Sequence, residues 1–295
     1  MVLVSSENRT FLIMKKIAFT LLLASGLFFS VQDADAQIKL PPASSTQFII
    51  QDLGISQVSI IYQRPNIKGR KIFGDLVPYN QIWRTGANNA TNITFQDEVK
   101  IEGKTLAAGT YALFTIPTKN EWTIIFNSNA KQWGAYTYDQ ADDVLRVKVK
   151  PVTLKDKVES FTISFDEVND QHMKTSLAWE NTKVSFMIEV DQKTEIMASI
   201  DEAMQGNKKP YFQAAQYYYT HNIDAKKAAE WMVEADKGNS NAPHIKYWKS
   251  LILAKAGDKA GAVKAAQEGI EMAKKEKNSE YVKLNTQALQ AAQKK

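Results

Sequence analysis

The chain of 295 residues contains no cysteine and only three histidines, at positions 172, 221 and 244. The absence of cysteine excludes disulfides, thiolate nucleophiles, Cys-ligated zinc and iron–sulfur clusters. No two histidines have the HxH or HxxxH spacing that would place them on one metal, which disfavours a His-rich metal site. We therefore expect no metal and no other cofactor.

Sequence motifs of common catalytic sites are missing as well. The chain has no GxSxG elbow, no Walker loop, no GxGxxG after an expected strand and no HExxH. No catalytic residue is assigned, and the sequence favours a binding or scaffold protein over an enzyme. Residues 194–295 contain no arginine, the side chain that nucleic-acid grooves favour, so we expect no nucleic-acid partner.

The first 36 residues have the organisation of a secretory signal peptide. Lys15 and Lys16 precede an apolar run from 17 to 29, which is too short to cross about 30 Å of hydrocarbon as a helix. The Ala34-Asp35-Ala36 tripeptide fits a cleavage site, so we expect cleavage after Ala36 and a periplasmic or secreted protein without a membrane span. Met14 lies directly before the lysines, so either Met1 or Met14 could be the true start.

Residues 37–191 alternate between apolar and polar side chains, as in Phe161, Ile163 and Phe165 around Thr162 and Ser164. A period of two indicates strands with one buried face. Because no helical pattern separates these strands, we predict an antiparallel β-sandwich. Ten strands are expected, near 47–51, 56–63, 92–96, 98–102, 109–116, 121–127, 144–150, 158–166, 172–180 and 183–190.

Residues 192–295 are rich in Ala, Lys, Glu and Gln, with apolar residues at helical spacing. Asp224 and Ala228 recur 34 residues later as Asp258 and Ala262, and 34 is the length of a tetratricopeptide repeat. We predict an all-α, tetratricopeptide-like array, with a plain helical bundle as the alternative. Six helices are expected, near 194–205, 210–220, 224–237, 242–256, 259–276 and 279–293, while Lys246 and Lys249 occupy positions where the repeat would have apolar residues.

The helical region also carries more aromatic residues than such short helices need for a core. They are Tyr211, Tyr217, Tyr218, Tyr219, Trp231, Tyr247 and Trp248. Aromatic side chains are enriched at interface hot spots, so one interpretation is a surface for a protein partner. The alternative is that they pack the helices onto the sandwich.

Two expected connections, 64–91 and 128–143, are longer than the usual four to six residues or so and contain aromatic, basic and amide side chains. They come after the second and the sixth expected strands, so both should leave the same end of the sandwich. Such side chains stack on sugar rings and hydrogen-bond to polar groups. The ligand-binding residues that this predicts are Arg64, Arg70, Trp83, Arg84, Asn88, Trp133, Tyr136 and Asp139.

These loops allow three functional interpretations. The first is recognition of a polar or anionic ligand, such as an envelope glycan. The second is that Trp83 and Trp133 close the end of the core while the arginines bind loop carbonyls, in which case the loops are structural. The third is a hydrolase acting on a cell-envelope polymer with carboxylates around Asp139; a calcium site at Asp139, Asp142 and Asp143 is disfavoured because EF-hand spacing is missing.

Several blocks in fixed order carry a resemblance to a known family. They are GRKIFG at 69–74, LVPY at 76–79, IWRTGAN at 82–88, AGTYALF at 108–114, WTIIF at 122–126 and DVLRV at 143–147. In these blocks the chain resembles an exported Bacteroidota family catalogued as domain of unknown function 2911, over roughly residues 45–190. The resemblance implies export from a Gram-negative cell and a β-rich domain, and it implies no activity and no catalytic residues.

Overall fold

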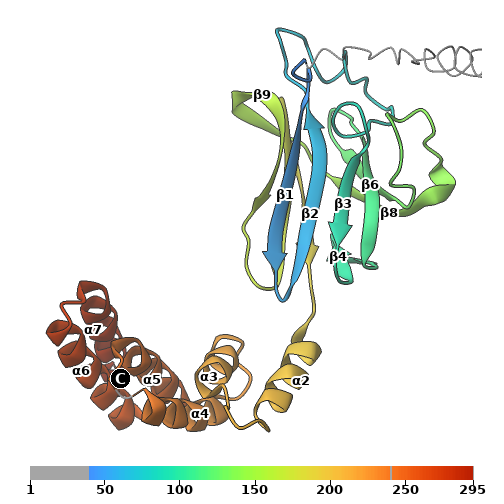
Figure 1. The fold of residues 1–295 in the computed structure, drawn as a ribbon. Helices are drawn as coiled ribbons and strands as arrows, with labels where there is room; N and C mark the ends of the chain where they lie inside the picture. The colour runs from blue at the N-terminus through green and yellow to red at the C-terminus, as the bar shows by residue number, and fades with distance from the viewer. Residues whose placement is uncertain (1–39, 240, 295) are drawn as a thin grey trace, which may run out of the picture. The chain divides into compact units, whose positions relative to one another are not determined.

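The computed structural model describes residues 40–239 and 241–294, so the signal peptide predicted at 1–36 lies outside the described residues. Within those limits, ten strands are followed by six α-helices, which confirms the predicted fold class (Figure 1). The strands are β1 (Ser45–Leu53), β2 (Ser56–Arg64), β3 (Thr91–Phe95), β4 (Val99–Ile101), β5 (Lys104–Leu106), β6 (Gly109–Ile116), β7 (Trp122–Asn127), β8 (Asp143–Val149), β9 (Val152–Asp166) and β10 (His172–Glu189). The helices are α2 (Lys193–Ala203), α3 (Tyr211–Thr220), α4 (Ala225–Gly238), α5 (Pro243–Ala256), α6 (Lys259–Lys275) and α7 (Ser279–Gln293), and a short 3₁₀-helix, η1 (Gln140–Asp142), precedes β8.

The strands form two sheets, one in the order β1-β2-β3-β6-β7-β8 and the other in the order β5-β4-β10-β9. The inner faces of the two sheets share one apolar core. Tyr62 of the larger sheet packs edge-on against Phe161 of the smaller one, with ring centroids 5.7 Å apart, and Phe126 meets Phe186 at 5.8 Å. The alternation in the sequence therefore marks the buried face of an antiparallel sandwich.

Two strand predictions were wrong. Residues 104–106, expected as part of a turn, pair with β4 and form β5. The segments expected as two strands at 172–180 and 183–190 form the single strand β10, which has register shifts against β9 on both sides of Glu180. Glu180 has a φ of 54°, and this irregularity interrupts the alternation in a way that a turn also would.

The 34-residue period corresponds to two equivalent helix starts. Asp224 accepts hydrogen bonds from the backbone of Lys226 and Lys227 at the start of α4, and Asp258 accepts one from Gly261 at the start of α6. Ala228 and Ala262, four residues after these caps, are both fully buried. The period therefore marks repeated helix geometry, while membership of the tetratricopeptide class stays a prediction.

Lys246 and Lys249 are accommodated by an ionic cluster rather than by apolar packing. Lys246 is 4% exposed and lies 2.9 Å from both Asp236 and Glu268, and Lys249 lies 2.7 Å from Asp236. Burial alone would raise the pKa of Asp236, but its hydrogen bonds to the two lysines outweigh burial and lower it. The same cluster raises the pKa of Lys246 against the effect of burial.

The aromatic residues of the helical region mainly build its own small core. Tyr218 and Trp231 are buried against each other, and Tyr211, Tyr219 and Trp248 pack around them. These aromatic side chains are therefore packed within the helical region, and they do not form the partner surface that one interpretation of the sequence expected. None of the helices in the described residues is both long and apolar enough to cross a membrane.

Candidate functional site

The two long connections do meet, although by a route other than the one expected. Ala90 donates a backbone hydrogen bond to Gln132 (3.0 Å), and Gly134 donates one to Asn88 (2.8 Å). The parity argument for this meeting was wrong. With β5 present, the second connection comes after β7, which runs antiparallel to β2 and so points to the other end of the sheet.

The connection after β7 reaches the first one by folding back across the outer face of the six-stranded sheet. Tyr138 and Ala135 pack there on Phe114 and other outward-facing residues of β6 and β7, forming a second small core. Buried Asn127 fixes the base of this connection. Its Nδ2 donates to the carbonyl of Asp139, and its Oδ1 accepts from Gln132. Asn127 and Gln132 were not predicted, because their role depends on the fold of the loop.

Trp133 and Tyr136 form an exposed stacked pair on this connection. Their rings are 5.7 Å apart and inclined by 14°, and the residues are 64% and 80% exposed. Gly134 between them has a φ of +72°, and a Cβ there would lie 2.6 Å from the Tyr136 ring. Glycine at this position therefore allows both the turn and the close approach of the ring. The predicted plug role fails for Trp133, which is solvent-exposed.

Arg84 lies beside this pair with part of its guanidinium unpaired. Its Nε is buried and has no hydrogen-bond partner in the part of the chain that the structure describes. Burial lowers the pKa of Arg84, and the nearby Tyr136 acts in the opposite direction. Within the described residues no carboxylate forms an ion pair with Arg84.

Two amide oxygens on the same face are also buried without a partner among the described residues. They belong to Gln63 and Asn92. Asn92 is paired with Ile61, and Gln63 is two residues after Ile61, so both side chains are on the outer face of the sheet. This end of the outer face thus combines unpaired polar atoms with an exposed aromatic surface.

Three of the predicted residues have structural roles instead. Trp83 is 7% exposed and stacks on Trp179 in the core, with ring centroids 5.9 Å apart, as the plug interpretation expected. Arg64 donates to the carbonyl of Phe161 and to Thr162, so it links the two sheets. Arg70 donates to the carbonyls of residues 66 and 67 within its own loop.

The carboxylates near Asp139 are also engaged locally. Asp139 caps η1 by accepting a hydrogen bond from Ala141. Asp143 accepts from Asn127, Tyr138 and Arg146, and burial together with Asp143 raises the pKa of Tyr138 to about 12. No cluster of three metal-binding side chains occurs among the described residues. The predicted residues that remain on a shared surface are Arg84, Asn88, Trp133 and Tyr136, which we call the rim.

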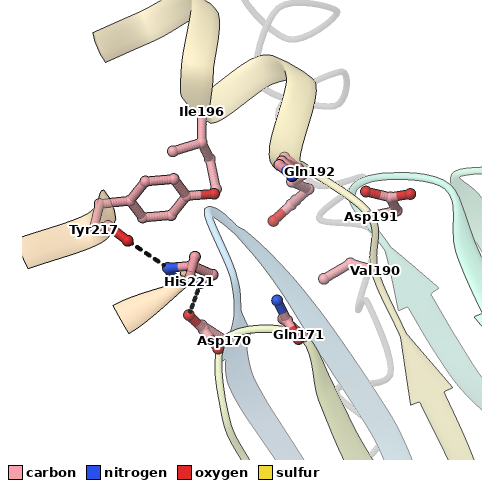
Figure 2. A pocket seen from close by; sticks show the side chains of 9 residues that line it. Asp170, Gln171, Val190, Asp191, Gln192, Ile196, Tyr217 and His221 are labelled. Atoms are coloured by element: carbon pink, nitrogen blue, oxygen red, sulfur yellow. Dashed lines mark hydrogen bonds and ion pairs between the residues drawn. The ribbon is translucent and has the colours of Figure 1, made fainter. Parts of the chain in front are cut away.

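A separate cavity of about 160 Å³ lies where the β9–β10 turn and the start of α2 approach the end of α3 (Figure 2). Its lining includes Asp170, Asp191, Lys193, Tyr217 and His221. The Nε2 atom of His221 is 2.8 Å from Asp170 Oδ2, as the dashed line in Figure 2 shows. Asp170 is 51 residues away from His221 in the chain, so no local sequence pattern indicates this contact.

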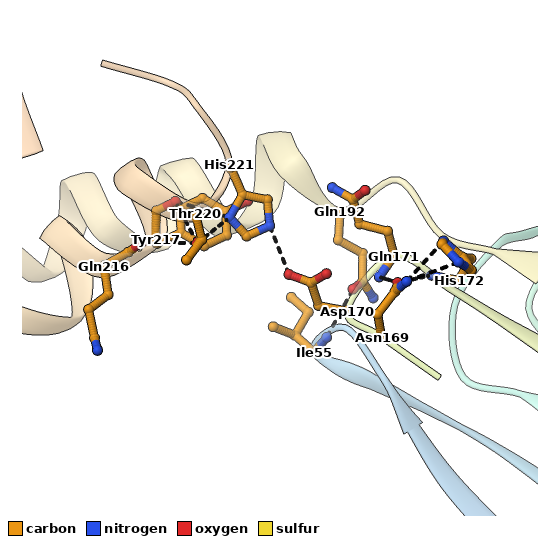
Figure 3. A network of polar contacts seen from close by, with 10 residues as sticks. All are labelled: Ile55, Asn169, Asp170, Gln171, His172, Gln192, Gln216, Tyr217, Thr220 and His221. Carbon is orange, nitrogen blue, oxygen red and sulfur yellow. Dashed lines mark hydrogen bonds and ion pairs between the residues drawn. The ribbon is translucent and has the colours of Figure 1, made fainter. Parts of the chain in front are cut away.

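Gln192 provides a second link at this junction (Figure 3). Its Oε1 accepts from the backbone of Ile55 at 2.9 Å, and its Nε2 donates to Ser56 (3.0 Å) and to Asp97 (2.6 Å). One amide side chain thereby ties the chain entering α2 to two turns of the sandwich.

Comparison with known proteins gives a family match over the strands and no activity. Residues 44–188 match the model of a family described as "Protein of unknown function (DUF2911)". The match covers the two sheets and supports the resemblance inferred from the sequence blocks. The searches of curated proteins and of solved structures found no match.

Proposed function

We propose that this chain is an exported binding protein whose rim recognises a polar or anionic ligand such as an envelope glycan. The observation that carries the proposal is the stacked, exposed Trp133–Tyr136 pair beside the partly unpaired guanidinium of Arg84. An exposed aromatic pair offers an apolar face to a sugar ring, while a guanidinium donates directed hydrogen bonds to hydroxyl or carboxylate oxygens.

The energetics of Arg84 support a ligand that carries acceptors. A buried donor without an acceptor costs about 1–3 kcal/mol, and more when it belongs to a charged group. Because Nε itself is buried, a ligand oxygen reaches it only if the Arg84 side chain shifts on binding, and such a contact would remove that cost in the bound state. The amide oxygens of Gln63 and Asn92 are buried as well, so the preference for a glycan over a simple anion rests on the exposed Trp133–Tyr136 pair, whose rings offer an apolar face to a sugar.

Export and a partner role for the helices complete the proposal. Residues 1–36 support passage to the periplasm or beyond, with cleavage after Ala36. The helices contain a groove of about 360 Å³ lined by Asp236, Lys249, Glu268 and other residues of α4, α5 and α6, which is where a partner with both charges would bind. The hydrolase alternative gains no support, because Asp139 and Asp143 are engaged in loop contacts.

The test is binding to polygalacturonate, an acidic polysaccharide, and to dextran, a neutral one, followed by tryptophan fluorescence and calorimetry. We expect the Trp133→Ala and Arg84→Gln variants each to weaken binding by about 5- to 150-fold, since each removes an interaction of roughly 1–3 kcal/mol. Arg84→Gln should weaken binding of polygalacturonate more than binding of dextran.

Lys71→Ala is the matched control, because Lys71 is an exposed cation of the same loop outside the rim. If Lys71→Ala weakens binding as much as Arg84→Gln does, the polymer is bound through the net charge of the protein, and the rim is not the binding site. If wild-type protein binds neither polymer, the glycan assignment fails. Circular dichroism of each variant separates lost binding from lost folding.

A further inference from the structure

His221 ends α3 with both ring nitrogens occupied. Nδ1 is 3.0 Å from the backbone carbonyl oxygen of Tyr217 and 3.1 Å from Thr220 Oγ1, and Nε2 is 2.8 Å from Asp170 Oδ2 (Figure 3). Asp170 is in the turn between β9 and β10, so this contact connects a sandwich turn to a helix end 51 residues away in the chain.

The proton count of these contacts defines the charge of the ring. A carbonyl oxygen only accepts, and the single hydroxyl proton of Thr220 has carbonyl acceptors at Gln216 (2.9 Å) and Tyr217 (3.2 Å). The partners of Nδ1 are therefore acceptors, so Nδ1 must carry a proton. The carboxylate at Nε2 is also an acceptor, so Nε2 must carry one too, and the full set of contacts is made only by the imidazolium.

The surroundings of the ring also favour the charged form. His221 is the C-cap of α3, where the helix dipole stabilises a cation. The Tyr217 ring stacks on the imidazole at 4.1 Å, and the pKa of Tyr217 is raised by burial and by Asp170 and Asp191, so Tyr217 stays neutral near pH 7. Asp170 and Asp191 line the cavity with His221, and Lys193 is the cation that lines it with them.

We propose that the His221–Asp170 contact is a pH-operated latch between the β9–β10 turn and the end of α3. When an imidazole loses its proton, one of its two nitrogens stops donating, so either the carboxylate or the carbonyl contact is lost. The latch is therefore complete while the ring carries both protons, and it weakens as rising pH removes one of them.

The Gln192 contacts act as the fixed counterpart of the latch. They join an amide to a backbone N–H, a hydroxyl and the carboxylate of Asp97, and none of them involves histidine. They do not depend on a ring proton, so loss of the proton from His221 leaves the start of α2 attached. Release at His221 then frees α3 to move about a retained attachment point.

The absence of cysteine makes the measurement direct. Single cysteines at exposed Lys157 and Lys283 accept a dye pair without any background labelling, and single-molecule energy transfer reports the distribution of their separation in the full chain. Because Asp170 is exposed, we expect a modest effect, about a two- to fivefold lower ratio of latched to released molecules at pH 8 than at pH 5.5.

Two variants decide the outcome. His221→Gln should give the wild-type pH 8 distribution at both pH values, and His172→Gln should keep the wild-type response. His172 is the matched control because, among the described residues, the hydrogen bonds of its ring go to Asn169 of the same turn. The proposal is overturned if the wild-type distribution is the same at both pH values, or if the response survives in His221→Gln. Circular dichroism checks that both variants are folded.

Discussion

The sandwich and the helical array solve the problem of burial in different ways. The largest fully buried side chains of the sandwich include Trp179, Tyr62 and Phe95, so each core residue removes a large apolar area from water. The fully buried positions of the array are mainly alanines, such as Ala215, Ala228, Ala262 and Ala266, which remove little area each. The array in addition buries an ionic cluster around Lys246. The comparison indicates that burial of large apolar side chains stabilises the sandwich, whereas close helix packing and paired charges stabilise the array.

The largest expected effect is in the sandwich. Trp179→Ala should destabilise it by about 3–5 kcal/mol, because the substitution leaves a cavity beside Trp83, Phe73 and Phe161. Denaturant unfolding followed by near-UV and far-UV circular dichroism measures this loss. We expect the helical transition to keep its midpoint. A shift of both transitions by equal amounts would show that the two regions unfold as one unit, against the comparison above.

Acid should destabilise the helical array, whereas the previous substitution destabilises the sandwich. The pKa of Asp236 is lowered by Lys249 and Lys246, so the stability that Asp236 contributes is present above its unfolded pKa, near 4, and is lost as the pH falls through the lower folded value. The array should therefore melt at lower temperature below pH 4. Thermal melts from pH 6 to pH 2.5 check this.

The matched variant for the acid experiment is Asp236→Asn. It should make the array less stable at pH 6 and reduce the slope of its melting temperature against pH. An unchanged slope in that variant would mean that other carboxylates cause the acid sensitivity.

The smallest effect is expected at the rim. Trp133→Ala should change the free energy of unfolding by less than about 0.5 kcal/mol, because most of this side chain is already in water. The same denaturant assay on Trp133→Ala and Trp179→Ala compares the free energy of unfolding contributed by an exposed tryptophan with that contributed by a core tryptophan of the same sandwich. A loss above 2 kcal/mol would give Trp133 a structural role and weaken the case for a binding surface.

The sequence predicted what local patterns encode. Alternation identified the buried strand faces, and the 34-residue period identified the equivalent caps at Asp224 and Asp258. It missed β5, in which only the last of three residues is buried, whereas β4 has the same length but alternates. It also took the irregularity at Glu180 for a turn. Pairings between distant segments, such as Lys246 with Glu268, have no local signature.

The candidate site was predicted in part for the same reason. Residue type selected Arg84, Trp133 and Tyr136, and the structure brings them together although the parity argument that joined the two loops was wrong. Residue type also gave Trp83 and Arg84 the same role although they are adjacent in the chain. Trp83 points into the core and Arg84 is partly exposed, because the segment pairs with Thr115 and alternates its side chains like a strand. The register of the pairing with Thr115 therefore decides which of the two side chains is buried.

The contacts of the Gln192 amide help to define the C-terminal boundary of the sandwich domain. The sequence placed the boundary between residues 191 and 192, yet this side chain completes the turns at Ile55 and Asp97. Gly54 belongs to the same arrangement, since a Cβ there would collide with the Gln192 side chain. A truncated sandwich that stops at residue 191 would lack the hydrogen bonds that Gln192 makes to these turns. The β-rich domain therefore ends at Gln192, the N-cap of α2, rather than before it.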